Sequence, residues 1–196
     1  MLLFTVTETD PGLNLALEEY LLESPPPDIG DRGALLLYEN AEALVIGKNQ
    51  NPWREIPLPV LLRGRPRLYR RISGGGAVYH GRGNLNFAFI VPGEGFSKEG
   101  NLDLVRRALG RLGAAAERTG RGDLLVAGRK VSGNALCYRK GRVLHHGTLL
   151  VNADLAALRA CLAADSPGAS GLRIETRAVA SVPMGVANLA EFLPGL

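Results

Sequence analysis

The stretch DLLVAGRKVSGNALCYRKGRVLHHGTLLVN, residues 123–152, decides the class of fold. It contains three runs rich in strand-forming residues, separated by the short turns Gly-Arg-Lys (128–130) and Lys-Gly-Arg (140–142). Turns this short reverse the chain and place consecutive strands side by side. The stretch therefore predicts a meander of antiparallel strands.

Helices are predicted on both sides of this meander. Residues 11–22 and 101–113 have the apolar spacing of amphipathic helices, and Asn101 is the expected cap of the second. Residues 153–164 predict another helix and residues 188–196 a short terminal one. The first helix should bury Leu13, Leu15, Leu17, Tyr20 and Leu21 and expose Glu18, Glu19 and Glu23; the second should bury Leu102, Val105, Leu109 and Leu112.

Further strands are predicted before the meander. Residues 34–40 and 42–49 are short apolar runs bounded by polar turns and predict a strand pair. After a proline-rich loop come strand candidates at 67–72 and 85–91. Because strands and helices do not alternate regularly, the sequence predicts an α+β fold rather than a doubly wound parallel sheet.

Length and composition favour one domain without a membrane segment. A chain of 196 residues that is 46% hydrophobic can form one substantial core. Its N-terminus lacks the pattern of a signal peptide, and no window approaches the roughly 18 to 20 apolar residues of a membrane span. Two cysteines without a CxxC motif favour a reducing compartment, so we expect a cytoplasmic protein.

The basic charge does not by itself indicate nucleic-acid binding. The net charge is +4 and the pI about 9.3. The one local concentration of arginines, from Arg63 to Arg71, contains a single aromatic residue, Tyr69, for base stacking, and its first three arginines fit a solvated loop. No nucleic-acid partner is predicted.

The segment RRISGGGAVYHGRGNLNF, residues 70–87, is the first candidate site. Glycine loses more backbone freedom on folding than any other residue and has no side chain to pack. Three glycines in a row beside two arginines therefore suggest a backbone that must approach a ligand closely. Arg71 offers a fork of donors suited to carboxylate or phosphate, and Ser73 adds a hydroxyl. Neither a P-loop nor a complete GxGxxG motif is present.

Residues 120–135, GRGDLLVAGRKVSGNA, form the second candidate site. Lys130 is one of few lysines in an arginine-rich chain, and its compact ammonium suits a phosphate or a reacting carboxyl oxygen. Asp123 could bind Mg²⁺ or position an amine. The small polar residues Ser132, Gly133 and Asn134 follow on the same predicted strand.

The pair His145-His146 is the third candidate. On a strand the two rings point to opposite faces, which disfavours a shared metal and favours a structural histidine bonded to backbone. Nucleophilic catalysis by Cys137 with a neighbouring histidine stays open, although a strand cysteine in an apolar run is more often buried.

In this order and spacing, the three candidate sites and their flanking segments resemble the lipoate-protein ligase family. The matching segments lie near the start and at 45–56, 70–87, 120–135, 145–155 and 186–196, so they span nearly the whole chain. The resemblance implies one catalytic domain over 1–196 of the biotin/lipoate-protein ligase type, with helices flanking a mixed, largely antiparallel β-sheet.

The resemblance also implies a two-step reaction. Lipoic acid and MgATP would give lipoyl-AMP and pyrophosphate, and a lysine of a lipoyl carrier domain would then attack to form an amide. The implied partners are lipoyl domains of 2-oxoacid dehydrogenase acyltransferase subunits or the glycine cleavage H protein.

Roles carry over onto the matching positions. Lys130 would be the electrostatic catalyst, and Asp123 would lie near the phosphates and Mg²⁺. The lipoate- and ATP-binding residues would be Arg71, Ser73, Gly74, Gly75, Gly76, Val78, His80, Asp123, Ser132, Gly133, His146, Gly147 and Thr148.

Three positions depart from the family pattern. Gly122 stands where an asparagine is common, Gly81 where an aspartate is common after His80, and Pro183-Met184-Gly185 where an Arg-Ser-Arg type sequence wraps the adenylate. The chain also ends where the family's catalytic domain ends. We therefore expect either a separate accessory ligase subunit or an altered adenylation step.

Two rival functions stay open. An octanoyltransferase of the same superfamily would carry a catalytic cysteine near 114–121 or 166–171, and this chain has none in either segment. A non-catalytic acyl-binding or carrier-binding subunit would also fit the altered residues 183–185.

Overall fold

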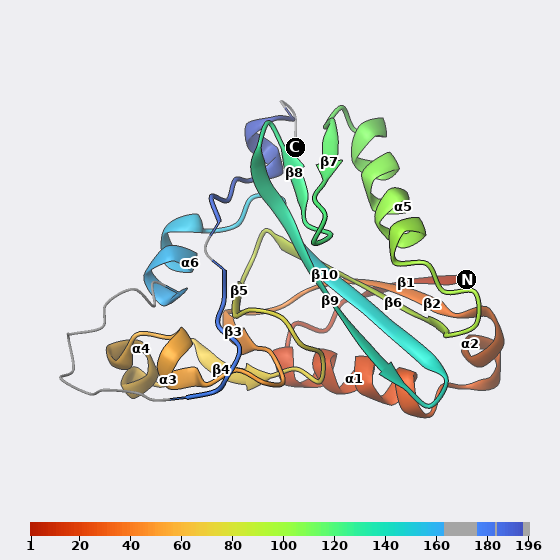
Figure 1. The fold of residues 1–196 in the computed structure, drawn as a ribbon, viewed down its shortest axis with the longest axis horizontal. Coiled ribbons are helices and arrows are strands. Elements are labelled where there is room, and N and C mark those ends of the chain that lie inside the picture. Colours follow the sequence, from red (N-terminus) through yellow and green to blue (C-terminus); the bar gives the residue numbers. More distant parts are fainter. Residues whose placement is uncertain (163–175, 183, 194–196) are drawn as a thin grey trace.

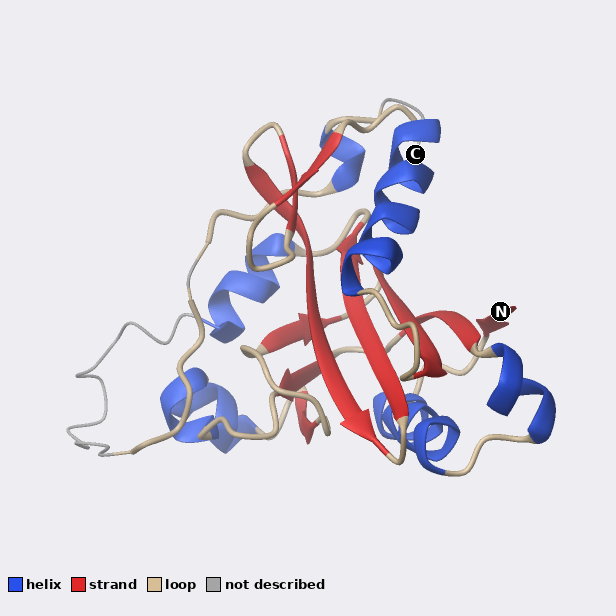
Figure 2. Cartoon of the chain, turned by 45° about the vertical axis from the view of Figure 1, so that its right-hand side comes forward, coloured by secondary structure: helices blue, strands red, loops and turns tan. Residues whose placement is uncertain are grey.

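The computed structural model describes residues 1–162, 176–182 and 184–193. Its main element is a seven-stranded, mixed but largely antiparallel sheet, which confirms the predicted fold class. Figures 1 and 2 show its long central hairpin crossing the molecule. In spatial order the strands are β1 (Leu2–Val6), β2 (Ala34–Glu39), β6 (Asn84–Pro92), β10 (Arg142–Leu150), β9 (Arg129–Arg139), β8 (Leu124–Val126) and β7 (Ala116–Arg118).

The predicted meander is formed by β8, β9 and β10. Arg139 pairs with Arg142, so Lys140 and Gly141 form a two-residue turn, and both have positive φ angles, 48° and 70°. Ala127 and Gly128 make the same kind of turn between β8 and β9, with φ of 48° and 74°. Two consecutive positive φ angles match the twist of a tight hairpin.

The predicted pairing of residues 34–40 with 42–49 is wrong. β2 lies in the large sheet between β1 and β6, whereas β3 (Ala43–Ile46) is the centre of a second sheet, between β4 (Arg67–Arg70) and β5 (Val78–His80). In the connection between them, the Ala41 amide donates to the Thr9 carbonyl, 2.8 Å away, instead of to a partner across a hairpin. All four residues of β3 are buried, as expected for the central strand of a covered sheet.

Helices flank both sheets. α1 (Pro11–Glu23) packs against β6 and β10, α5 (Lys98–Arg111) against β7, and α6 (Leu155–Leu162) against β5. The proline-rich segments also contain α2 (Pro27–Arg32), α3 (Pro52–Glu55) and α4 (Leu58–Arg63), which were not predicted. Each begins with or next to a proline, whose fixed φ and missing N–H are tolerated in a first turn. No helix in the described ranges is long and apolar enough to cross a membrane.

Two predicted helix boundaries need correction. α5 begins after Ser97, whose hydroxyl accepts from the Gly100 amide at 2.9 Å, so Asn101 lies inside the helix and is not its cap. Leu112, expected in the core, lies after the helix and is 61% exposed. At the C-terminus the predicted helix is a single 3₁₀ turn, Leu189–Glu191, and residues 194–196 lie outside the described part, as do the predicted helix residues 163 and 164.

The buried face of α1 also differs from the prediction. Leu13 and Tyr20 are 58% and 55% exposed, whereas Asn14 and Glu18 are almost fully buried. These two polar residues are one helical turn apart and lie on one face. Their burial means that α1 covers a polar region rather than only an apolar core, and this region borders the candidate site.

Candidate functional site

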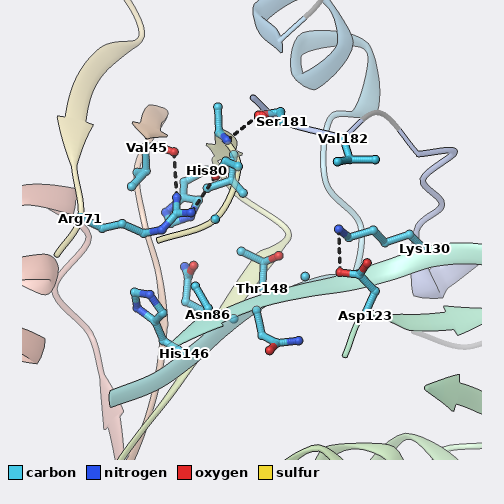
Figure 3. Close-up of a pocket in the computed structure, with 18 of the residues that line it drawn as sticks. Val45, Arg71, His80, Asn86, Asp123, Lys130, His146, Thr148, Ser181 and Val182 are labelled. Carbon is cyan, nitrogen blue, oxygen red and sulfur yellow. Dashed lines mark hydrogen bonds and ion pairs between the residues drawn. The ribbon is translucent and has the colours of Figure 1, made fainter. Parts of the chain in front are cut away.

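A cavity of about 360 Å³ lies between the glycine-rich segment, strands β9 and β10, and residues 179–182 and 184. Most of the predicted site residues line it. Figure 3 shows Arg71, His80 and His146 on one side, Lys130 and Asp123 on the opposite side, and Thr148 between them. The predicted residues on its wall are Arg71, Gly75, Gly76, Val78, His80, Asp123, Lys130, Gly133, His146, Gly147 and Thr148.

A second cavity of about 550 Å³ adjoins the first. Lys130, Gly133 and Thr148 line both cavities, so the two meet at these residues. Ser132 lies on the wall of the second cavity only. Its hydroxyl and both amide atoms of Asn84 are buried without a hydrogen-bond partner among the described residues. A buried, unpaired amide is costly unless a ligand or water satisfies it.

The Lys130 ammonium is held by Asp123. The Nζ–Oδ1 distance is 2.8 Å, and the two side chains are 26% and 15% exposed. The amine also lies above Gly133, because a Cβ built there would be 3.1 Å from Nζ. Of the two roles expected for Asp123, positioning an amine is therefore the one its contacts match. No cluster of three metal-ligating side chains occurs within the described ranges.

Arg71 shapes the glycine-rich loop from inside. Its Nη2 donates to the carbonyls of Gly74 and Gly76, both at 2.7 Å, and Nη1 donates to the Val45 carbonyl at 3.1 Å. Burial lowers its pKa to about 10, partly opposed by the negative charge of Glu18. Most donors of its fork are used by backbone carbonyls, although the side chain also lines the first cavity. Gly74 accordingly contributes a carbonyl to Arg71 rather than a cavity wall.

His146 belongs to a buried hydrogen-bonded chain. Its Nδ1 lies 2.7 Å from Glu18 Oε2, and its Nε2 lies 2.7 Å from the Ser73 hydroxyl. Glu18 also accepts from the Tyr38 hydroxyl at 2.8 Å, and Ser73 accepts from Arg71 Nε at 3.1 Å. Ser73 therefore lies behind the wall and joins His146 to Arg71.

His145 and His146 point to opposite faces of β10, as predicted. His145 packs against Phe87, Phe89 and Phe96, and its Nε2 lies 3.1 Å from Asn134 Oδ1. Burial lowers its pKa to about 4, with smaller contributions from Lys98 and His146. The prediction of a backbone-bonded histidine is wrong for both rings, since their partners are side chains.

His80 is held by an asparagine pair. Asn40 Nδ2 lies 2.8 Å from His80 Nδ1, and Asn14 Nδ2 lies 2.8 Å from Asn40 Oδ1. Burial lowers the pKa of His80 to about 3, with further lowering by the Arg71 charge and by His146. The ring is therefore neutral at physiological pH and lines the first cavity.

Residues 176–182 and 184–187 cross between the two cavities; we call them the strap. The Ser181 hydroxyl accepts from the Ala77 amide at 2.9 Å and donates to the buried carboxylate of Glu55. At the other end, the Lys130 amide donates to the Gly185 carbonyl at 2.9 Å. Met184 lines both cavities, and Pro183 lies outside the described residues. Within the departing segment 183–185, Met184 thus lines the site and Gly185 is bonded to Lys130 beside it.

Neither cysteine has the environment of an activated nucleophile. Both thiols are free, and burial raises the pKa of Cys137 and of Cys161. A raised pKa reduces the thiolate fraction on which reactivity depends. Residues 166–171, the second place where a transferase cysteine was sought, lie outside the described part.

Several residues around the site were not predicted. Asn40, Asn86 and Glu18 are buried polar side chains, and Ser181 joins the site from far along the chain. A buried polar residue cannot be told from an exposed one by its type alone. The spacing of Asn14 and Glu18 was the available signal, because two polar residues one turn apart share a helix face.

Comparison with known proteins identifies the family to which the chain belongs. The lipoyl protein ligase A/B catalytic domain model matches residues 10–196. A lipoate-protein ligase A of Bdellovibrio bacteriovorus is 39% identical over 197 residues, which is 98% of this chain and 56% of that protein. The chain thus spans about half the length of this curated relative.

Two solved structures share the fold over essentially the whole chain. P. falciparum LipL1 in complex with lipoate has a TM-score of 0.84 and 29% identity, covering 100% of this chain and 57% of that one. A lipoate-protein ligase A bound with ATP has a TM-score of 0.77 and 25% identity, covering 98% and 77%. The chain therefore belongs to the family of lipoyl protein ligase A/B catalytic domains.

Proposed function

We propose that this chain is a lipoate-protein ligase, which activates lipoic acid with ATP and transfers the lipoyl group to a lysine of a lipoyl domain. The observation that carries the proposal is the position of Lys130 at the junction of two adjoining cavities, held there by Asp123. In the adenylation of an acid, the carboxylate and the nucleotide must meet beside a cation that stabilises the phosphate charge.

The first cavity suits the acyl chain and the second the nucleotide. The first is lined by Lys130 on one side, by His80 and Arg71 on the other and by Thr148 between them, which suits a thin chain that runs from Lys130 toward His80. The second contains the Asn84 amide, which has no hydrogen-bond partner among the described residues and offers a donor and an acceptor side by side. Such an amide can bond both N6 and N7 of an adenine. The relative solved with bound ATP supports a nucleotide as one of the two substrates.

The first chemical step joins the acid to the nucleotide. A carboxylate oxygen of the acid attacks the α-phosphorus, the bond to the β-phosphate oxygen breaks, and pyrophosphate leaves. Negative charge on the α-phosphate oxygens is stabilised by the Lys130 ammonium, which Asp123 orients before the reaction begins.

The second step transfers the acyl group. The amine of a carrier lysine attacks the acyl carbonyl, the bond to the phosphate oxygen breaks, and AMP leaves while the amine loses a proton. Lys130 again lies where oxygen gains charge, so it acts in both steps as an electrostatic catalyst and never as the nucleophile.

Mg²⁺ fits this site as an ion carried mainly by the nucleotide. Magnesium usually binds one or two carboxylates together with substrate phosphates. Asp123 is the one carboxylate that lines the first cavity among the described residues. Asp123 would help to hold the ion, which would neutralise phosphate charge when bound.

The expected acceptors are the lipoyl domains named from the family resemblance, in the cytoplasm. Residues 183–185 lack the cations of the family pattern, so we propose that a separate accessory subunit assists adenylation. The octanoyltransferase alternative has less support, because the pKa of Cys137 is raised and its side chain packs with the apolar cluster around Leu22 and Ile90.

The test supplies apo lipoyl domain with lipoate and MgATP, with octanoyl-acyl carrier protein, or with preformed lipoyl-AMP. Modification only with lipoate and MgATP supports the ligase. Modification only from the acyl carrier protein contradicts it, and modification only from lipoyl-AMP indicates that adenylation needs a partner. Lys130→Ala should abolish transfer, whereas Lys140→Ala, on the exposed turn of the same hairpin, should not.

A further inference from the structure

Two polar residues of α1 are connected by hydrogen bonds to the two histidines that line the first cavity. Asn14 leads through Asn40 to His80, and Glu18 contacts His146 directly. In both cases the contact reaches Nδ1 of the ring. Nδ1 of His80 accepts a hydrogen bond, whereas Nδ1 of His146 donates one. This difference determines what each ring offers to a ligand.

The Asn14–Asn40–His80 chain runs in one direction. Asn14 Nδ2 donates to the Glu8 carbonyl and to Asn40 Oδ1, both at 2.8 Å. A carbonyl only accepts, so the donor atom of Asn14 is fixed, and Asn40 Oδ1 is the acceptor. Asn40 Nδ2 therefore faces His80 Nδ1 and donates to it. A neutral imidazole that accepts at Nδ1 carries its proton on Nε2.

His146 has the opposite arrangement. A carboxylate only accepts, so Glu18 accepts from the Nδ1–H of His146, just as it accepts from the Tyr38 hydroxyl. Ser73 accepts from Arg71 Nε, a pure donor, so the Ser73 hydroxyl hydrogen is free for His146 Nε2. Both nitrogens of His146 are thereby used within the protein, and the ring offers a ligand no free polar atom.

His80 is different because its Nε2–H has no partner among the described residues. The residue is 5% exposed and lines the first cavity, so this donor reaches a ligand or water only through the cavity. Figure 3 places His80 beside Arg71, on the side of the cavity away from Lys130. An acid whose carboxyl group lies at Lys130 would bring the far end of its chain toward His80.

We propose that His80 is a specificity-determining residue, whose Nε2–H donates to an acceptor atom at the far end of the acyl chain. The cavity then selects an acid that ends in a heteroatom group, such as the cyclic disulfide of lipoate, over an unsubstituted acid of the same length. This inference rests on the proposed ligase function. An alkyl end would cover the donor without pairing it, and sites with buried donors discriminate against analogues that lack the acceptor.

The experiment measures kcat/KM with lipoate and with octanoate for the wild type, His80→Gln and His80→Leu. Wild type should prefer lipoate about tenfold, the effect of one buried donor left unpaired. Gln places an amide N–H near the position of Nε2 and should keep most of the preference. Leu has a similar bulk but no donor, and the ratio should fall to about one, mainly through loss of lipoate use.

Binding measured by NMR tests the same point without a substitution. In ¹⁵N-histidine-labelled wild type, His80 should show a protonated Nε2 and an unprotonated Nδ1, and lipoate should shift the Nε2 resonance while octanoate should not. The opposite tautomer, or an equal response to both acids, would overturn the proposal even if His80→Leu does not fold.

The outcomes separate this inference from the proposed function. If the wild type, with an accessory subunit where required, activates neither acid, the ligase function fails. If it ligates both acids with equal kcat/KM, or if His80→Leu keeps the wild-type ratio, the ligase function stands and the role of His80 is wrong.

Discussion

Glu18 and His146 are joined by a 2.7 Å contact in the interior, although helix α1 and strand β10 supply them from positions 128 residues apart in the sequence. Glu18 is 1% exposed and His146 8%. Through Ser73 the contact continues to Arg71, around which the glycine-rich loop is folded. A carboxylate on the first helix thus supports the shape of the loop that lines the candidate site.

Replacing Glu18 should cost more than replacing its neighbour. In Glu18→Ala the Tyr38 hydroxyl and His146 Nδ1 lose a buried acceptor, and we expect the free energy of unfolding to fall by about 3 kcal/mol. Urea denaturation measures this change. The matched control is Glu19→Ala, which breaks a half-exposed pair with Arg139 and should cost less than about 1 kcal/mol. Equal losses in both variants would contradict a structural role for the Glu18 network.

Asp123→Asn tests the orientation of Lys130. The amide keeps the size of the side chain but removes the charge that holds Nζ at 2.8 Å. We expect kcat for acid-dependent pyrophosphate exchange to fall by about 10- to 100-fold, with the free energy of unfolding nearly unchanged because the pair is partly exposed. The matched control, Asp103→Asn, breaks a surface pair with Arg106 on α5 and should leave exchange unchanged. Wild-type exchange in Asp123→Asn would remove this residue from the mechanism.

Gly147→Ala should destabilise the central hairpin. A Cβ at this position would lie 2.5 Å from Phe87 Cζ and 2.6 Å from the Gly133 carbonyl oxygen, so the sheet would have to move. We expect a loss of about 2 kcal/mol or more in thermal or urea unfolding. Gly110→Ala on α5 is the control: a Cβ there meets nothing within 4 Å, and the helix should gain about 1 kcal/mol. An unchanged free energy of unfolding in Gly147→Ala would mean that the hairpin accommodates the methyl group.

Stability should fall as the pH is lowered from neutral. Burial holds the pKa of His145 at about 4 and that of His80 at about 3, below the ordinary value of 6.5, so the unfolded chain binds these protons more readily. Their full contribution to stability is present above pH 6.5 and is lost progressively toward pH 4. For His145 this amounts to at most about 3 kcal/mol. Urea unfolding at pH 7.5, 6 and 5 should show a smaller slope in His145→Asn, and an unchanged slope would contradict the assignment.

The fold class and most of the site could be read from local sequence. Alternating apolar residues and two-residue turns predict the β8–β9–β10 meander, since register and reversal depend on neighbouring residues. The three candidate segments likewise supply most of the lining of the first cavity. The three consecutive glycines, the rare lysine and the histidine pair stand out from their neighbours, so these positions can be recognised from the sequence alone.

Other features depend on contacts between distant segments. Local pattern cannot distinguish β2 and β3 as a hairpin from their actual places in two sheets, because β2 pairs with β1 and β6 and β3 pairs with β4 and β5, and these partners lie elsewhere in the sequence. The same holds for Glu18, which amphipathic spacing assigns to solvent.

The sequence by itself therefore determined the meander, the glycine-rich loop and the presence of Lys130. The tertiary structure alone decided that Arg71 bonds the loop carbonyls, that Asp123 holds Lys130, and that the Nε2–H of His80 has no partner among the described residues. The physical reason is that the role of a polar side chain depends on its partners and on its access to water. Those partners lie far away in sequence, as Asn40 is from His80.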